Sequence, residues 1–374
     1  MKPSDASRLL AEFPQGAAIL IIRLRSLGDI VLETPAIAAL HAWRPDLRIS
    51  VLIEARFAAA LEGNPDITEV IYPRGFAATT AELRRREFAI AFNQHGGPRS
   101  AFLTAASGAA QRVCWKGFQY SFLYNVHCPD AEEFYGLPVV HTVEHRISQF
   151  YWAGLPRGPV PKTRVYAQRE AEEAVSRQLA GAGIAPGAAY CVMQPGARLP
   201  GMRWPARKFA EIARWLREQF GIATVVNLGA GDTAVTPEVR SEMSDCAAIP
   251  EPLELRELIA LVAGARVFVG NDSGPTHVAA ATGRPCVVIY GATNPAQWHP
   301  WQTEYRAVHT NAEFHPRRGD KSVAASMPRP IQSIEVEEVR VACEELLSRP
   351  AGGDASAAHV NREAKVKSNG IKTI

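Results

Sequence analysis

The chain has 374 residues, of which 47% are hydrophobic and 21% are charged, and its formal net charge is +3 at pH 7. This length predicts two domains, and the composition is typical of a globular protein rather than of a disordered chain. A net charge this small argues against a nucleic-acid partner, because proteins that bind nucleic acids usually concentrate basic charge on one face.

The sequence shows neither a signal peptide nor a membrane span, and its cysteines are scattered; both features predict an intracellular protein. Residues 1–16 lack the apolar core of a signal peptide, and no apolar run reaches the roughly 18 residues of a membrane span. We therefore expect the protein to be cytoplasmic. Its cysteines are scattered without the spacing of a metal site, so we expect them to be buried and reduced. They are Cys114, Cys128, Cys191, Cys246, Cys286 and Cys343.

In the first half of the chain, apolar runs of strand length alternate with helical patterns. Such alternation predicts parallel βαβ units in a doubly wound sheet. The pattern is unclear between residues 111 and 154, apart from a helix over 144–156. The predicted strands are 17–24, 48–54, 69–72 and 88–93, and the helices between them are 29–45, 55–63 and 80–88.

A proline-rich linker over 156–166 separates this half from a second α/β half. The predicted helices there are 169–183, 205–221, 253–265, 275–283 and 333–349, and the strands are 189–196, 222–231, 266–274 and 285–291. We therefore expect two Rossmann-like, doubly wound domains, 1–160 and 161–332, then a C-terminal helix over 333–349 and a disordered tail over 350–374. Ligands of such sheets bind at the carboxyl ends of the strands, which predicts a site in a cleft between the domains.

The segment NDSGPTHVAAATG joins a predicted strand to a predicted helix. Ser273 and Gly274 would expose N–H groups at the helix N-terminus, where a diphosphate binds well, and Pro275 suits the first helical turn. His277 lies in the first turn of this helix. Asp272 would repel a phosphate, so we expect it to cap the helix, bind sugar or ribose hydroxyls, or order the loop. A plain strand-to-helix turn is the alternative interpretation.

The segment RLRSLGDI follows the first strand. Gly28 permits a tight turn, and Asp29 begins a helix, where an aspartate is usually an N-cap. The same carboxylate could instead take a proton from a hydroxyl group. Arg23 and Arg25 would then hold an anionic partner.

Two further loops follow predicted strands of the second half. Arg198 and Arg203 lie in a glycine-rich loop and would suit a pyrophosphate, although arginines exposed on loops are common. The other loop, NLGAGD, contains Gly229 and resembles a dinucleotide fingerprint only loosely.

Taken together, these segments resemble glycosyltransferase family 9, the lipopolysaccharide heptosyltransferases. RLRSLGDIVLETPAIAAL is similar to the opening motif of that family, PGARLPGMRWP to its middle motif, and NDSGPTHVAAATGRPCVVIYGATNP to its nucleotide-sugar motif. The resemblance covers about residues 17–347 and keeps the order of the motifs. At Met202 the family usually has a lysine that meets the donor phosphate, and Arg198 or Arg203 would have to supply this charge.

The resemblance implies a GT-B fold, in which domain 1–160 binds the acceptor and domain 161–332 binds the nucleotide sugar. The C-terminal helix would pack back on the first domain. The implied reaction is an inverting transfer of heptose from ADP-heptose to a growing lipopolysaccharide core, and it uses neither a metal nor a cofactor.

The resemblance makes Asp29 the general base and places the donor diphosphate on the turn that begins at Ser273. The predicted donor-binding residues are Arg198, Arg203, Gly229, Asp272, Ser273, Gly274, Pro275, Thr276 and His277. The predicted acceptor-binding residues are Arg23, Arg25, Ser26, Gly28 and Gln94.

Three other interpretations remain. A nicotinamide-dependent oxidoreductase would need a glycine fingerprint after the first strand, which RLRSLGD does not provide. A non-catalytic protein that binds nucleotide sugars would tolerate Met202, and so would a transferase with another donor or acceptor. In addition, the aromatic and basic segment 112–125 and the arginines near residue 85 indicate peripheral contact with the inner membrane, or else an acceptor loop beside a solvated helix.

Overall fold

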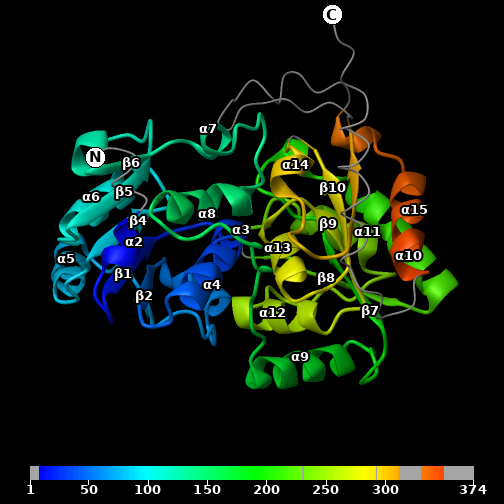
Figure 1. Cartoon of the computed structure of the whole chain (residues 1–374). Helices are drawn as coiled ribbons and strands as arrows, with labels where there is room; N and C mark the ends of the chain where they lie inside the picture. The colour runs from blue at the N-terminus through cyan, green and yellow to red at the C-terminus, as the bar shows by residue number, and fades with distance from the viewer. Residues whose placement is uncertain (1–7, 230, 292, 311–329, 349–374) are drawn as a thin grey trace, which may run out of the picture.

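The computed structural model describes residues 8–229, 231–291, 293–310 and 330–348, which form two α/β domains side by side (Figure 1). The predicted tail, 350–374, lies outside the described residues. Within the described ranges, no helix has the length and apolar character needed to cross a bilayer. All six cysteines are buried and free, as the sequence predicts.

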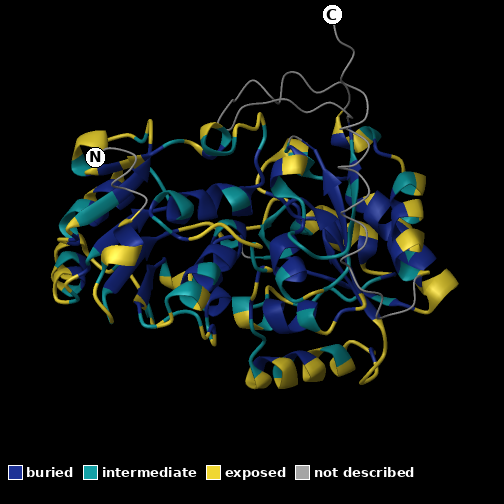
Figure 2. Ribbon diagram, in the orientation of Figure 1, coloured by how far each residue is buried: buried dark blue, intermediate teal, exposed yellow. Residues whose placement is uncertain are grey.

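The N-terminal domain is built on a sheet of parallel strands in the order β3-β2-β1-β4-β5-β6. All five residues of the central strand β1 are buried, because helices cover both faces of the sheet (Figure 2). The strands are β1 (Ala18–Ile22), β2 (Arg48–Leu52), β3 (Glu69–Ile71), β4 (Ile90–Asn93), β5 (Gln111–Trp115) and β6 (Val126–Cys128).

Two of the helices predicted for this domain differ in the structure, and those over 9–12, 98–106 and 131–135 were not predicted. The single helix expected over 29–45 is wrong: it is broken into two, because Pro35 has no N–H to continue the ladder and Thr34 Oγ1 donates to the Val31 carbonyl instead, at 2.7 Å. The segment 55–63 forms only a short 3-10 helix. The helices are α2 (Leu9–Glu12), α3 (Leu27–Val31), α4 (Thr34–Trp43), η1 (Ala55–Ala60), α5 (Phe76–Arg84), α6 (Pro98–Ala106), η2 (Ser121–Leu123), α7 (Ala131–Tyr135) and α8 (Thr142–Trp152).

The C-terminal domain has a second parallel sheet, in the order β11-β10-β9-β7-β8. Its strands are β7 (Tyr190–Gln194), β8 (Ala223–Val226), β9 (Val267–Asn271), β10 (Cys286–Tyr290) and β11 (Tyr305–His309). Its helices are α9 (Arg169–Gly181), η3 (Pro200–Met202), α10 (Ala206–Phe220), α11 (Thr236–Met243), α12 (Leu255–Ala263), α13 (Gly274–Ala281), α14 (Pro295–Trp298), η5 (Ile331–Ser333) and α15 (Val336–Leu347). The edge strand β11 and the helix α11 were not predicted.

The last helix, α15, packs on the C-terminal domain, so the prediction that it returns to the N-terminal domain is wrong. Its buried residues, among them Val339 and Cys343, join the core formed by β7, β10 and α10. Lys208 on α10 fixes the approach to this helix by donating from Nζ to the Ile334 carbonyl at 2.7 Å. In Figure 1, α15 lies beside α10, on the side away from the N-terminal domain.

The two domains touch where α3 and α13 begin. A Cβ atom on Gly28 would lie 2.7 Å from His277 Cδ2, and one on Gly274 would lie 3.1 Å from the Cβ atom of Leu27. Glycine at both helix starts therefore permits this close approach of the backbones.

Candidate active site

Asp29 lies in the first turn of α3, directly beyond the carboxyl end of β1. Ser26 occupies the N-cap position of this helix, so the interpretation of Asp29 as the cap is wrong. Ser26 Oγ donates to Asp29 Oδ2 at 3.0 Å. The carboxylate is therefore oriented by Ser26 and does not cap the helix.

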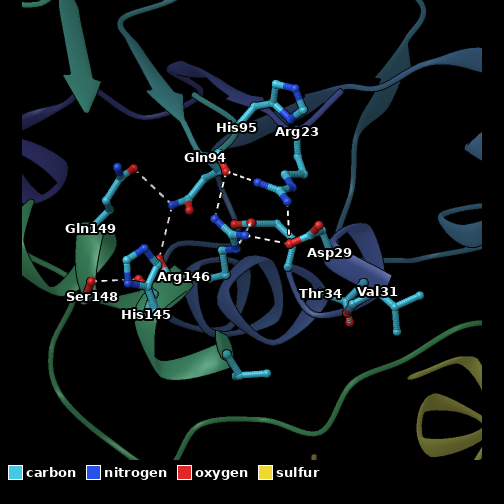
Figure 3. A network of polar contacts seen from close by, with 12 residues as sticks. Arg23, Asp29, Val31, Thr34, Gln94, His95, His145, Arg146, Ser148 and Gln149 are labelled. Atoms are coloured by element: carbon cyan, nitrogen blue, oxygen red, sulfur yellow. Dashed lines mark hydrogen bonds and ion pairs between the residues drawn. The ribbon is translucent and has the colours of Figure 1, made fainter. Parts of the chain in front are cut away.

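Two arginines from distant parts of the chain hold the same carboxylate oxygen (Figure 3). Arg23, which follows β1, forms an ion pair with Asp29 Oδ1. Arg146, on α8, places Nη2 2.8 Å from this oxygen. Both guanidinium groups also donate to the backbone carbonyl of Gln94, Arg146 from Nη1 at 2.8 Å. The end of β4 thus positions both cations.

The side chain of Gln94 faces α8. Its Nε2 donates to Gln149 Oε1 at 3.0 Å and to the Arg146 carbonyl at 3.1 Å, and the residue is 0% exposed. Because the side chain has no exposed surface, an effect of Gln94 on acceptor binding would be indirect, through the two arginines that its carbonyl holds. Gln94 holds α8, and with it Arg146, against the sheet.

The surroundings of Asp29 keep its carboxyl group ionised. Burial raises its pKa, but Arg23 and Arg146 lower it more, so that the pKa lies well below its usual range. Nearby Glu33 behaves in the opposite way: burial raises its pKa to about 7 against the opposing charges of Arg146 and Arg23. The site therefore contains one strongly ionised carboxylate and one that titrates near neutrality.

Across the domain contact, the turn after β9 is tied to the loop after β7. Asn271 Nδ2 donates to the Pro195 carbonyl at 2.7 Å, and Asn271 Oδ1 accepts from the Trp204 N–H at 3.1 Å. Ser273 has extended backbone before α13, and its buried Oγ has no hydrogen-bond partner among the described residues. Thr276 is fully buried and donates to the Asn271 carbonyl at 3.0 Å, so its side chain shapes the turn.

Two titratable side chains of this segment are buried. Burial raises the pKa of Asp272 to about 6. Burial also lowers the pKa of His277 to about 4, against the opposing charge of Asp29. His277 is therefore neutral at pH 7 and faces the Asp29 network from the opposite domain.

The loops after β7 and β8 carry the remaining predicted donor residues. Arg203 Nε donates to the Ala197 carbonyl at 2.7 Å, whereas Arg198 is exposed. Asp232 joins the two loops, because its carboxylate accepts from the Gly229 N–H at 2.9 Å and would collide with a Cβ atom on Gly196. Gly229 is therefore fixed in the C-terminal domain by a side-chain contact.

The structure thus brings Arg23, Ser26, Gly28 and Asp29 to the start of α13, while Arg25 is exposed at the same strand end. Sequence reasoning missed Arg146 and Glu33. The signal for Arg146 was a charged residue on the otherwise buried face of a predicted helix.

A cavity of about 740 Å³ lies elsewhere, at the outer edge of the C-terminal sheet. It is lined by α9, by β8 and by the loop over 244–253, and none of the predicted site residues is among its lining residues. This cavity is therefore not the candidate site, which is formed by the side chains around Asp29 and α13.

Known proteins are similar to this chain over most of its length. The model of glycosyltransferase family 9 (heptosyltransferase) matches residues 77–327. Lipopolysaccharide heptosyltransferase 2 of Escherichia coli (strain K12) is 27% identical over 325 residues, which are 81% of this chain and 91% of that protein. Lipopolysaccharide heptosyltransferase 3 of the same strain is 26% identical over 294 residues, 74% of this chain and 83% of that protein.

Solved structures show the same fold. A glycosyltransferase family 9 protein from Veillonella parvula DSM 2008 has a TM-score of 0.79 at 22% identity, covering 90% of this chain and 98% of that one. An ADP-heptose heptosyltransferase II from E. coli has a TM-score of 0.73 at 22% identity, covering 88% and 98%. The predicted GT-B fold with two Rossmann-like domains is thereby confirmed.

Proposed function

The chain belongs to glycosyltransferase family 9, and from this premise we propose that it transfers a heptose from ADP-heptose to a lipopolysaccharide core acceptor. The observation that carries the proposal is the position of Asp29. Its carboxylate lies at the end of β1, is held by Arg23 and Arg146, and faces the start of α13 from the other domain.

In the proposed reaction, Asp29 accepts the proton of an acceptor hydroxyl. The hydroxyl oxygen attacks the anomeric carbon from the face opposite the nucleotide, so that a new carbon–oxygen bond forms as the bond to the diphosphate breaks. ADP leaves with the electron pair of the broken bond, and the anomeric configuration is inverted. The scheme requires no metal, because protein groups supply the positive charge.

On the donor side, the diphosphate would bind the free N–H groups at the start of α13, around Ser273 and Gly274. Arg198 and Arg203 in the neighbouring loop would stabilise the charge that develops on the leaving group. The buried Oγ of Ser273, which has no partner among the described residues, is a further donor for a phosphate oxygen.

On the acceptor side, Arg25 is exposed next to the buried network and would bind an anionic group of the acceptor. His95, after β4, shares this environment. Burial lowers its pKa to about 4, and the charges of Arg23 and Arg25 act in the same direction. His95 would therefore act as a neutral hydrogen-bonding group.

Met202 favours a second candidate, a family member with another donor or acceptor, or one that binds without catalysis. It lies in η3, where its Cα atom would be 3.2 Å from a Cβ atom on Gly291. The cation that the family usually has at this position is absent from this chain, so Arg198 or Arg203 would have to supply its charge. A thermal-shift comparison separates the candidates: stabilisation by ADP and ADP-heptose supports the proposed donor, whereas stabilisation by UDP alone contradicts it.

We also propose that the protein acts at the cytoplasmic face of the inner membrane. Three exposed aromatic residues of the N-terminal domain form a cluster: Phe122 is 78% exposed, Phe102 44% and Tyr120 38%. The ring of Tyr120 lies 5.4 Å from that of Phe102 and 6.4 Å from that of Phe122. Exposed aromatic rings suit the headgroup region of an anionic bilayer, and Arg84, whose Nε donates to the Ala106 carbonyl of the helix that carries Phe102, adds an exposed cation next to that helix.

A further inference from the structure

Glu33 is a buried carboxylate between α3 and α4 that the proposed reaction does not use. It is 1% exposed, and neither of its side-chain oxygens accepts a hydrogen bond from the described residues. The nearest cation is Arg146, whose Nε lies 3.8 Å from Glu33 Oε2 and has no hydrogen-bond partner in the same part of the chain. A buried carboxylate with so little compensation is costly, which suggests a role beyond packing.

Arg146 faces both carboxylates with different nitrogens of one guanidinium group. Nη2 contacts Asp29, Nη1 is held by the carbonyl of Gln94, and Nε points to Glu33. The contact with the Gln94 carbonyl fixes the plane of the guanidinium group. Arg146 therefore faces both carboxylates in a single side-chain conformation.

The charges of this group change when Asp29 takes up a proton. With both acids ionised, Arg23 and Arg146 are balanced by Asp29 and Glu33. Protonation of Asp29 then leaves Glu33 as a counter-charge for the guanidinium groups. With Glu33 neutral, the same proton transfer leaves two buried cations without a carboxylate, which opposes the transfer.

We propose that Glu33 is a positioning residue that sets the basicity of Asp29 by sharing Arg146 with it. The inference rests on the proposed role of Asp29 as the general base. When Glu33 is ionised, its negative charge offsets part of the positive charge of Arg146, and Asp29 is a stronger base. When Glu33 is protonated, this offset is lost and Asp29 is a weaker base.

Burial and the charged groups around Glu33 together set its pKa near neutrality. Arg146 on α8, Arg23 after β1 and Asp29 on α3 act on it electrostatically, and His277 on α13 faces Asp29 in turn. Burial raises the pKa of Glu33 to about 7. Turnover should therefore rise with pH through about 7, as Glu33 loses its proton and Asp29 becomes a better proton acceptor.

The coupling can be tested without any substrate by following the carboxyl carbons in carbon-13 NMR. In the wild-type protein we expect one glutamate resonance to titrate near pH 7 and to be absent from Glu33→Gln. In Asp29→Asn the midpoint of this resonance should fall, because the neighbouring negative charge is gone and Arg146 is free for Glu33. An unchanged midpoint in Asp29→Asn would overturn the proposal.

The kinetic test compares Glu33→Gln with wild type in ADP release from ADP-heptose with an acceptor. We expect Glu33→Gln to lose the rise in kcat near pH 7 and to turn over roughly tenfold more slowly at pH 8, with unchanged KM for the donor. Glu33→Asp, which keeps the charge, should retain the rise and covers the case in which Glu33→Gln does not fold. The matched control is Glu82→Gln on α5, whose carboxylate pairs with Arg86.

A wild-type pH profile in Glu33→Gln would overturn the proposal. If wild type releases no ADP at any pH while the NMR coupling is present, the proposed function fails and the electrostatic link between Glu33 and Asp29 stands.

Discussion

Arg146 Nη2 lies 2.8 Å from Asp29 Oδ1, although 117 residues separate the two in sequence. The contact connects α8, the last helix of the N-terminal domain, to α3, the short helix that follows its first strand. It also places a second cation beside Arg23, so that one carboxylate is held from two directions. A reactive group held in this way keeps its position while substrates bind and leave.

Removing Arg146 should destabilise the protein more than removing an ordinary surface arginine. Its side chain is 6% exposed, and Arg146→Ala leaves Asp29 and Glu33 with one cation fewer. We expect a loss of about 3–5 kcal/mol in the free energy of unfolding, measured with urea. Arg169→Ala, which removes an exposed pair with Glu173, is the control and should change it by less than about 1 kcal/mol. Equal effects of the two variants would contradict the buried network.

Glu33 should make stability depend on pH in a definite direction. Its pKa is about 7 in the folded protein and 4.5 ordinarily, so folding favours the protonated form. Its contribution is fully present below pH 4.5 and is lost as the pH rises through 7. The wild-type protein loses this contribution between pH 5 and pH 8, whereas Glu33→Gln does not. The free energy of unfolding of Glu33→Gln minus that of the wild-type protein should therefore increase over this range, by up to about 3 kcal/mol. A difference that stays constant between these pH values would argue against a buried, titrating Glu33.

The glycine at the start of α3 should matter for the contact between the domains. A Cβ atom on Gly28 would lie 2.7 Å from His277 Cδ2, so in Gly28→Ala either the His277 ring or α13 itself must shift. We expect kcat to fall by roughly 10- to 100-fold, because the acceptor and donor sides separate, while circular dichroism changes little. Gly181→Ala in α9, away from the candidate site, is the matched control, since none of the described residues has an atom within 4 Å of the added carbon. Wild-type turnover in Gly28→Ala would show that this contact is not needed.

The aromatic cluster predicts binding to anionic lipid. Phe102→Ser combined with Phe122→Ser should greatly reduce flotation with vesicles of phosphatidylethanolamine and phosphatidylglycerol. The control is Phe220→Ser, which removes a ring of the C-terminal domain that is 38% exposed, close to the 44% of Phe102. This variant should leave flotation unchanged. Transfer to a water-soluble acceptor should be unaffected in both variants. No flotation of the wild-type protein would end the membrane proposal, and a dimer broken by the double substitution would assign the cluster to a second copy of the chain.

The parts of the site that follow strands were predictable, and the parts that depend on tertiary contacts were not. Asp29 and the turn at Ser273 stand out because each lies after a buried strand and at the start of a helix, where the backbone itself creates a site. Arg146 lies in a region of mixed pattern, and only the packing of α8 on the sheet brings it to Asp29. The position of α15 was missed for the same reason: its apolar stripe requires a partner but does not specify which domain provides it.

In the proposed transfer from ADP-heptose, Asp29 takes the proton of the acceptor hydroxyl. The most direct measurement is ADP release, with the mass of the glycan product, for wild type and Asp29→Asn at saturating donor and acceptor. We predict that the wild-type protein adds one heptose and that Asp29→Asn loses turnover by roughly 100- to 10,000-fold while still binding ADP-heptose. An Asp29→Asn variant with near wild-type turnover would contradict it, and so would a wild-type protein that binds ADP-heptose but adds no heptose.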